Sequence, residues 1–245
     1  MVSPQNSEII SPRSNEFFNN QWIVYQKILK GNYMGHREIY DVLHQLLINY
    51  FQKPFKILEL GCGDASFTSQ ALSNTLVESY KGVDLSQTAL EIATSNMAQI
   101  QCSQSFIEGD FSKVVSELVK NQQGSFDAIL ISFALHHLLL EQKDSIIGDF
   151  SNLLTADGVF ILIDVCRKQE EDRGSYITRY LEDIEQNWSL ISPKEYLVVA
   201  DHIRLNDFPE SQETLHEIAQ KHNFNRFECL YRDRLDTTKL LCFYR

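Results

Sequence analysis

The sequence predicts an α/β fold in which a mostly parallel sheet carries helices on both faces. Five short apolar segments, each typical of a buried strand, alternate with segments whose apolar residues recur at helical spacing. Such alternation is typical of consecutive βαβ units. The chain has 245 residues, of which 43% are hydrophobic, so a single large core can be buried. We therefore expect one domain.

The elements of this core can be placed in chain order. The expected strands are 56–60, 80–84, 105–110, 126–132 and 158–165, and the helices between them are 65–76, 87–99, 112–121 and 143–154. Ser86 is a suitable N-cap for the second helix, because its hydroxyl can accept from the free amides of the first turn. Turns at Gly124-Ser125 and Ala156-Asp157-Gly158 precede the fourth and fifth strands.

Helical segments are also expected on both sides of this core. Residues 36–51 form an amphipathic helix by the spacing of their apolar residues, which are Ile39, Val42, Leu43, Leu46 and Leu47. A shorter helical stretch that contains Trp22 precedes it. Residues 167–208 hold two helical patterns, around 171–188 and 193–203, and are too long for a simple connection. We predict that they cap the edge of the sheet.

The chain closes with a helix and two strands. The helix is expected at 211–222, and the strands lie in the segments RFECLYR and KLLCFYR. Only a short turn, Asp233 to Thr237, separates the two strands. They must therefore run antiparallel to each other.

The composition argues against several classes of function. The 22 Lys and Arg residues are outnumbered by 33 Asp and Glu residues, which makes the formal charge −11. Nucleic-acid binding draws on clustered Lys and Arg, so we expect no nucleic-acid partner. No segment approaches the ~20 apolar residues of a membrane helix, and the N-terminus lacks the blocks of a signal peptide. We expect a cytoplasmic protein without a membrane partner.

A glycine motif marks the end of the first strand. Glu59-Leu60-Gly61-Cys62-Gly63-Asp64-Ala65 lies where that strand meets the first helix. Glycines let the backbone approach a ligand, and a helix N-terminus offers unpaired amides, although a tight turn alone would also explain the pattern. A dinucleotide fingerprint would want glycine at position 66, which is serine.

Two further acids make the motif more specific. Asp84, followed by Leu85, ends the second strand, where a carboxylate can accept both hydroxyls of a ribose. Asp110 ends the third strand, where it can meet an adenine amino group, and Phe111 is available to stack. Each acid alone would also suit a loop or a helix cap. Together with Glu59 they lie at the edge where open α/β sheets bind ligands.

These residues resemble the class I S-adenosylmethionine-dependent methyltransferases over 56–165 and again over the terminal helix and hairpin. Glu59, Gly61 and Gly63 match the family's acid-x-Gly-x-Gly-x-Gly motif, in which Ala65 replaces the third glycine. The resemblance implies a Rossmann-like seven-stranded sheet of order 3-2-1-4-5-7-6, with strand 7 antiparallel. It also implies S-adenosylmethionine as cofactor and S-adenosylhomocysteine as product. Glu59, Gly61, Cys62, Gly63, Asp84, Leu85, Asp110 and Phe111 are then expected to bind the cofactor.

The loop after the fourth strand is expected between cofactor and acceptor. It reads Ser132-Phe133-Ala134-Leu135-His136-His137-Leu138 and lacks the Asn/Asp-Pro-Pro-aromatic motif of nucleic-acid amino methyltransferases. The resemblance places Ser132 beside the methionine portion of the cofactor. His136 and His137 are the candidate catalytic residues, because a histidine there can take a proton from the acceptor. Alternatively, one or both hydrogen-bond the loop.

The flanking segments are expected to close the site. Within residues 1–52, a helical lid, we expect Tyr25, Tyr33 and Arg37 to contact the cofactor. Residues 53–165 form the cofactor-binding core, 166–209 a helical cap and 210–245 the terminal helix and hairpin. Catechol-type enzymes hold Mg²⁺ with acids after the fourth and fifth strands, and here the fourth strand ends in Ser132, so we expect no metal. The five cysteines contain no C-x-x-C and indicate neither zinc nor disulfides.

The predicted function is methyl transfer from S-adenosylmethionine to an oxygen, less readily a nitrogen, of a small organic or short-peptide acceptor. Two alternatives remain at this point. One is a methyltransferase-like protein that binds the nucleoside without turnover and acts as an interaction module. The other is a protein methyltransferase.

Overall fold

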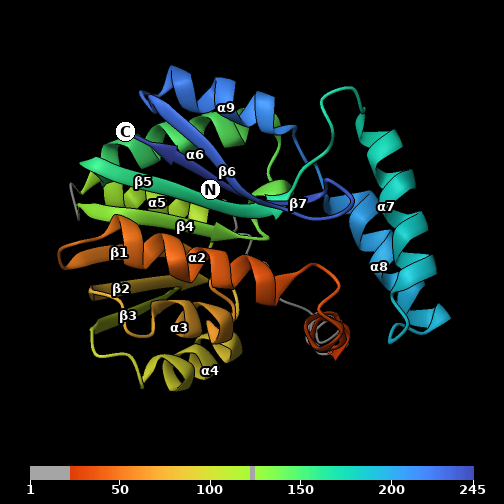
Figure 1. Cartoon of the computed structure of the whole chain (residues 1–245), viewed down its shortest axis with the longest axis horizontal. Helices are drawn as coiled ribbons and strands as arrows, with labels where there is room; N and C mark the ends of the chain where they lie inside the picture. The colour runs from red at the N-terminus through yellow and green to blue at the C-terminus, as the bar shows by residue number, and fades with distance from the viewer. Residues whose placement is uncertain (1–22, 122–124) are drawn as a thin grey trace, which may run out of the picture.

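A seven-stranded sheet forms the centre of the molecule (Figure 1). The computed structural model describes residues 23–121 and 125–245. The strands are β1 (Phe55–Leu60), β2 (Val77–Asp84), β3 (Ser103–Glu108), β4 (Phe126–Ser132), β5 (Leu154–Val165), β6 (Arg226–Arg232) and β7 (Thr238–Tyr244). Their order is β3-β2-β1-β4-β5-β7-β6, and β7 runs antiparallel to both of its neighbours. The predicted fold class and strand order are confirmed.

Helices cover both faces of this sheet. They are α2 (His36–Tyr50), α3 (Ser66–Leu72), α4 (Gln87–Met97), α5 (Phe111–Lys120), α6 (Leu140–Leu153), α7 (Arg173–Asn187), α8 (Pro193–Asn206) and α9 (Gln212–Lys221), with a short 3₁₀ turn η1 (Leu135–His137). Residues 23–31 are also helical. Apolar side chains of α5, α6 and α9 form the core on one face, and those of α2, α3 and α4 form it on the other. In the described part of the chain, no helix is both long and apolar enough to cross a membrane.

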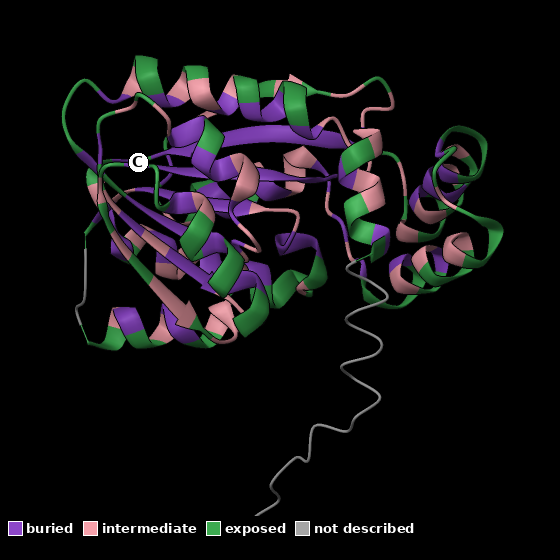
Figure 2. Ribbon diagram, turned by 90° about the horizontal axis from the view of Figure 1, so that it is seen from below, coloured by how far each residue is buried: buried purple, intermediate pink, exposed green. Residues whose placement is uncertain are grey.

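The inner strands are buried between these layers, the edge strands β3 and β6 are partly exposed, and the outward faces of the helices are exposed (Figure 2). In α2, the buried Ile39, Leu43 and Leu47 recur at helical spacing, and this stripe packs on the sheet. All seven residues of β7 are buried, because it lies between β5 and β6. A continuous apolar run such as Leu240–Tyr244 is what such a strand requires.

Several boundaries differ from the sequence prediction. β2 begins at Val77 rather than at residue 80, and β3 spans Ser103–Glu108 rather than 105–110, so Asp110 follows the strand that it was expected to end. The structure extends β5 back to Leu154, through the expected turn at Ala156–Gly158. Leu154 pairs with Phe126 and Val159 with Ala128, so the extra residues of β5 form an irregularity within the strand. Helix α3, expected over 65–76, ends at Leu72, and Asn74 after it has a left-handed backbone with φ 57°. Trp22 and Gly124 lie outside the described residues.

Helices α7 and α8 form a cap with an apolar cluster of its own. Tyr176, Tyr180 and Trp188 are buried there with Ala200 and Ile203. This cluster also contains Val165, the last residue of β5, and Phe133 packs against it. The cap therefore contacts the ends of β4 and β5, at the carboxyl edge of the sheet.

Candidate active site

The loop after β1 brings the backbone to the edge of the sheet in a left-handed conformation. Gly61 has φ 72° and Gly63 has φ 52°, values that favour glycine. A Cβ on Gly61 would lie 2.9 Å from the Ala134 side chain, whereas a Cβ on Gly63 would meet nothing within 4 Å. The backbone at Gly63 is therefore open to a ligand. Ala65, in place of the third glycine, also has a positive φ of 49° and is buried in the core beside α3.

Asp84 ties this loop to the end of β2. Its Oδ2 accepts from the Gly63 amide at 2.8 Å, and its Oδ1 accepts from the Ser86 amide at 2.9 Å. The amides of Gly61 and Cys62 in turn donate to the Val83 carbonyl, at 2.8 and 3.0 Å. A carboxylate has about four lone-pair sites, so Asp84 can still accept from ligand hydroxyls.

Glu59 is a buried acid directly behind the glycine loop. It is 1% exposed, and its two oxygens accept from the hydroxyls of Thr68 at 2.7 Å and Tyr80 at 2.6 Å. Burial raises the pKa of Glu59 to about 7, although the two hydroxyl donors partly oppose this shift. The carboxyl group is therefore close to half ionised near neutral pH.

A cavity of about 40 Å³ lies against this loop. Its lining combines the loop with side chains of β4, α3 and the N-terminal helices: Tyr25, His36, Tyr40, Glu59, Gly61, Cys62, Gly63, Asp64, Ala65, Ser66, Phe67, Thr68 and Ser132. This volume is smaller than the ~300–1,000 Å³ that is usual for a ligand pocket. Loss of solvent around its hydroxyl raises the pKa of Tyr25, and the charges of Asp64, Asp84 and Glu59 raise it further, although 38% of the residue as a whole is exposed. Tyr25 therefore extends from its helix into the acidic part of the site.

Tyr40 and Ser132 form a hydroxyl pair in the wall of this cavity. The Tyr40 hydroxyl donates to Ser132 Oγ at 2.8 Å. Burial raises the pKa of Tyr40, so this hydroxyl stays protonated. Ser132, placed in the site by the end of β4, keeps its own hydrogen for a further acceptor.

His36 is a site residue that was not among the predicted cofactor contacts. It is 2% exposed, lines the cavity, and neither ring nitrogen has a hydrogen-bond partner. Burial lowers its pKa to about 4, so the ring is neutral at pH 7. Its ring contacts Phe67 and Phe133, with centroids 5.4 and 4.8 Å apart. The only sequence signal was its place among the aromatic residues of the expected lid.

Phe133 directly follows β4 and has a left-handed backbone with φ 49°. Such a conformation is uncommon for a bulky residue and is typical of functional sites. The Phe133 amide donates to the Ile163 carbonyl at 2.7 Å, which holds the turn against β5. The turn places the Phe133 ring between His36 and the cap cluster.

The residues expected to contact adenine lie beside this cavity rather than in its lining. Asp110 is the N-cap of α5 and accepts from the Ser112 amide at 2.9 Å. Phe111 packs partly buried against the core, and Leu85 is 69% exposed. Asp84 and Asp110 nevertheless follow neighbouring strands, and the Gly109 amide donates to the Asp84 carbonyl at 2.9 Å. The adenine-binding role of this edge remains a prediction.

The structure places Tyr33 and Arg37 away from the cavity. The Tyr33 ring stacks on Trp188 with centroids 5.0 Å apart, and its hydroxyl accepts from the Leu190 amide at 2.6 Å. Arg37 is exposed and donates to the Lys30 carbonyl at 3.3 Å. The cap supplies stacking and backbone partners for Tyr33, and Arg37 is exposed, so the expected cofactor contact of both residues remains a prediction.

His136 and His137 also lie outside the cavity lining. His136 Nδ1 contacts Asp164 Oδ1 at 2.5 Å, and the Phe208 amide donates to the His136 carbonyl at 2.7 Å. Burial lowers the pKa of His136, but the Asp164 and Asp207 carboxylates outweigh that effect and raise it. Burial lowers the pKa of His137 to about 4. Both residues join the loop after β4 to the segment after α8, which the sequence could not pair with them.

Comparison with known proteins identifies the class. Residues 57–158 match the family described as "Methyltransferase domain". An uncharacterized methyltransferase of Bacillus cytotoxicus is 25% identical over 158 residues, which cover 64% of this chain and 69% of the relative. The uncharacterized methyltransferase YrrT of Halobacillus halophilus is 26% identical over 190 residues, covering 76% and 83%.

Solved structures share the fold at low sequence identity. The plantazolicin methyltransferase BpumL, in complex with a triazolic desmethylPZN analog and SAH, matches with a TM-score of 0.62 at 14% identity and covers 96% of this chain and 92% of its own. The cyclopropane synthase MmaA2 from Mycobacterium tuberculosis matches with a TM-score of 0.56 at 17% identity. That match covers 79% of this chain and 62% of the synthase.

The chain therefore carries a class I S-adenosylmethionine-dependent methyltransferase domain, and S-adenosylmethionine is its cofactor. The predicted enzyme class and cofactor are confirmed. The residues in and beside the cavity fit this group: the backbone at Gly63 is open, Glu59 is an acid in the cavity lining, Asp84 lies behind Gly63, and the buried His36 nitrogens have no partner within the described chain.

Proposed function

We propose that the enzyme transfers the methyl group to an oxygen atom of a small organic or short-peptide acceptor. The observation that carries this proposal is a contact between the N-terminal helix, residues 23–31, and the cap, which together form a roof over the site. Lys27 of this first helix contacts the Glu195 carboxylate of α8 at 2.6 Å, and Tyr33 stacks on Trp188. The N-terminal helix and the cap are thus joined across the carboxyl edge of the sheet. A folded protein or a nucleic acid would need that edge open, whereas a small acceptor fits beneath it.

The hydroxyl pair supports oxygen as the accepting atom. Ser132 accepts from Tyr40 and can donate its own hydrogen to the acceptor. An oxygen that accepts this hydrogen bond keeps a second lone pair for attack on the methyl group. A neutral amine that accepted the same hydrogen bond would have its one lone pair occupied, so it would have to donate an N–H to Ser132 Oγ instead. We therefore propose a hydroxyl or carboxylate acceptor.

Catalysis in this proposal rests on alignment within a water-poor site. When bound, S-adenosylmethionine supplies a methyl group on a sulfonium, which a nucleophile in line can take. Gly63 and Asp84 hold the nucleoside, Ser132 orients the acceptor, and Phe133 and the cap exclude water. Alignment and exclusion of water account for large rate effects, and a carboxylate acceptor would need no base. A hydroxyl acceptor would have to lose its proton, and the neutral His36, whose ring nitrogens have no partner in the described chain, is available to take it.

The test is a labelled-methyl screen of metabolite and peptide pools, with the products examined for ester, ether and amine linkages. We expect label in an ester or ether of a small compound. Label found only on nitrogen, or only on folded proteins, would contradict the proposal. Binding of S-adenosylhomocysteine without transfer to any acceptor would favour a nucleoside-binding interaction module.

Asp84 is proposed to accept the ribose hydroxyls. Loss of such charge-assisted hydrogen bonds costs about 1.5–3 kcal/mol, so Asp84→Ala is expected to weaken S-adenosylmethionine binding at least about tenfold. Calorimetry measures the affinity. Because Asp84 also holds the Gly63 amide, thermal unfolding of the variant shows whether the fold is kept. Unchanged affinity would remove Asp84 from the cofactor site.

A further inference from the structure

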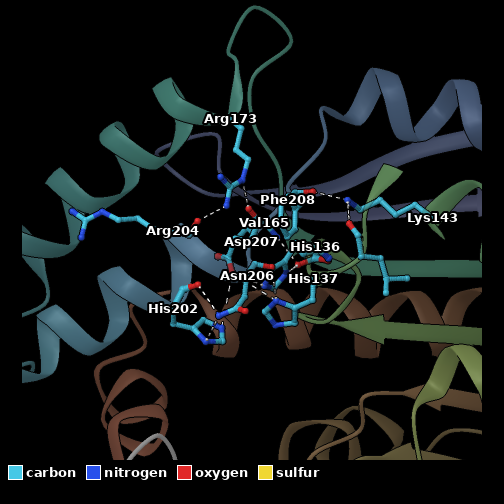
Figure 3. Close-up of polar contacts among 12 residues, drawn as sticks. His136, His137, Lys143, Val165, Arg173, His202, Arg204, Asn206, Asp207 and Phe208 are labelled. Atoms are coloured by element: carbon cyan, nitrogen blue, oxygen red, sulfur yellow. Dashed lines mark hydrogen bonds and ion pairs between the residues drawn. The ribbon is translucent and has the colours of Figure 1, made fainter. Parts of the chain in front are cut away.

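Asp207 places a carboxylate oxygen among three histidine rings. The residue is 4% exposed, and its Oδ1 atom has no hydrogen-bond partner in the described part of the chain. The nearest imidazole nitrogens are His137 Nδ1 at 3.6 Å, His136 Nε2 at 3.7 Å and His202 Nε2 at 3.9 Å (Figure 3). These separations exceed a hydrogen bond. His137 Nδ1 also lies 3.2 Å from the Asn206 carbonyl oxygen, and a metal ion bound at this nitrogen would replace that contact. A buried anionic oxygen with no partner is costly unless a cation accompanies it.

The separations are close to those that a metal ion imposes on its ligands. Zinc binds histidine nitrogen and carboxylate oxygen at about 2.0–2.2 Å in a tetrahedral arrangement, which sets neighbouring ligand atoms about 3.3–3.5 Å apart. His136, His137 and Asp207 each offer one such atom, and these atoms lie within 4.8 Å of one another. The cluster must contract by up to about 1.3–1.5 Å to hold an ion, and His202, whose Nε2 lies 3.9 Å from Asp207 Oδ1, can complete it as a fourth ligand.

Asp164 orients one of these rings from behind. Its Oδ1 lies 2.5 Å from His136 Nδ1, and its Oδ2 accepts from the His136 amide at 2.9 Å. With its hydrogen on Nδ1, the ring directs the lone pair of Nε2 toward Asp207. A carboxylate that holds the far nitrogen of a histidine is the usual support of a metal-binding histidine.

The backbone beside Asp207 is held at several points. The buried Lys143 donates to the carbonyls of Leu138 and Phe208, at 2.7 and 2.5 Å. Arg173 donates to the Asp207 carbonyl at 2.6 Å. The unpartnered side-chain oxygen therefore belongs to a fixed segment rather than to a loose loop.

We propose that His136, His137, His202 and Asp207 bind one zinc-type divalent cation. Three imidazoles and one carboxylate suit zinc, whereas Mg²⁺ and Ca²⁺ prefer oxygen ligands. The ligands come from the loop after β4, from α8 and from the residue after α8, so the ion fastens the cap to the sheet. No metal was expected from the sequence, because that expectation rested only on acids at the ends of the strands. This site uses histidines from segments that only the fold brings together.

The test uses the full chain without a histidine tag, treated with a chelator and then titrated with Zn²⁺ in a calorimeter. We expect one equivalent to bind, with affinity lowered at least about tenfold in Asp207→Asn and in His202→Ala. His222→Ala is the matched control, because His222 contacts Asp144 at 3.1 Å in a pair outside the cluster. It should bind Zn²⁺ as the unmodified chain does. Mg²⁺ should not compete.

Two further readouts keep the outcome clear. Co²⁺ in place of zinc should give the strong visible absorption of a tetrahedral site, and this absorption should be lost in the Asp207 variant. If Asp207→Asn fails to fold, His202→Ala decides, because its ring is 39% exposed and its loss leaves the core intact. Absence of zinc binding, or equal binding in the cluster variants and His222→Ala, would overturn the proposal. The cluster would then serve as a polar contact between cap and core.

Discussion

Glu59 combines full burial with a charge that the cofactor's ammonium group would favour. Its pKa of about 7 in the folded chain lies above the ordinary value of 4.5. Between these values the folded state holds a proton that the unfolded state has released. The contribution of Glu59 to the free energy of unfolding is therefore present at low pH and is lost as the pH rises through about 7.

The Glu59→Gln variant should lose this part of the pH dependence, and at pH 8 it should be at least as stable as the unmodified chain. Urea unfolding between pH 5 and 8 measures the effect. Cofactor affinity of the unmodified chain should rise from pH 6 to 7.5 as Glu59 ionises, whereas the variant should show weaker binding without this rise. Parallel pH profiles for the two proteins would show that Glu59 does not titrate in this range.

His36 offers a second test at the level of one residue, because stability and binding should respond in opposite ways. A buried polar group without a partner costs about 1–3 kcal/mol. His36→Phe removes both nitrogens and keeps the ring contacts with Phe67 and Phe133. We expect unchanged or higher stability in urea unfolding, and binding of cofactor or acceptor weakened at least about tenfold.

His44→Phe is the control for this experiment. His44 lies on the same helix, and its Nδ1 contacts the Ala71 carbonyl at 2.8 Å. This variant should lose stability and keep its binding affinity. If His36→Phe binds both ligands normally, His36 is a packing residue.

At the scale of elements, the sequence predicted what local pattern determines. Apolar runs identified the strands, and the short turn at Asp233 to Thr237 identified the antiparallel hairpin, because these signals lie within one segment. The start of β5 was missed, since the polar Thr155 and Asp157 lie in an irregularity of the strand. Asp207 was missed as a partner of His136, because 71 residues separate them and no periodicity links them.

The contact between the first helix and the cap is a property of elements, and Tyr33 is its centre. Loss of the ring in Tyr33→Ala removes the stack on Trp188 and the hydrogen bond from Leu190. We expect faster amide exchange over residues 23–34 and 188–192, measured by mass spectrometry. Residues 39–50 should remain protected, because Ile39, Leu43 and Leu47 are buried in the core.

S-adenosylhomocysteine should slow exchange over residues 23–37 of the unmodified chain. Tyr33→Phe keeps the stack on Trp188 and loses the hydroxyl, so its amide exchange over residues 23–34 is expected to be faster than in the unmodified chain and slower than in Tyr33→Ala. Identical exchange with and without the nucleoside would mean that the first helix is permanent structure and not a lid. The part of the expected lid before residue 23 lies outside the described residues.

For the whole molecule, the apolar clusters that cover the sheet are separate from the cluster of the roof. Neither of the two core clusters that cover the sheet contains a described residue before Ile39. Ile28, Tyr33 and Met34 pack instead against the cap cluster. Removal of residues 1–35 should therefore leave a folded sheet with cooperative thermal unfolding, although the cap loses some of its contacts.

The same deletion should change how the cofactor enters and leaves. Tyr25 lines the cavity of about 40 Å³, so we expect the helix of residues 23–31 to move before the cofactor binds. Without this helix we expect S-adenosylhomocysteine to associate faster and to dissociate faster still, so that affinity falls at least about tenfold. Methyl transfer should be lost, because water reaches the site. Stopped-flow binding measures both rates. An unchanged association rate would show that the helix does not gate the site, and unchanged affinity together with normal turnover would show that residues 1–35 take no part in it.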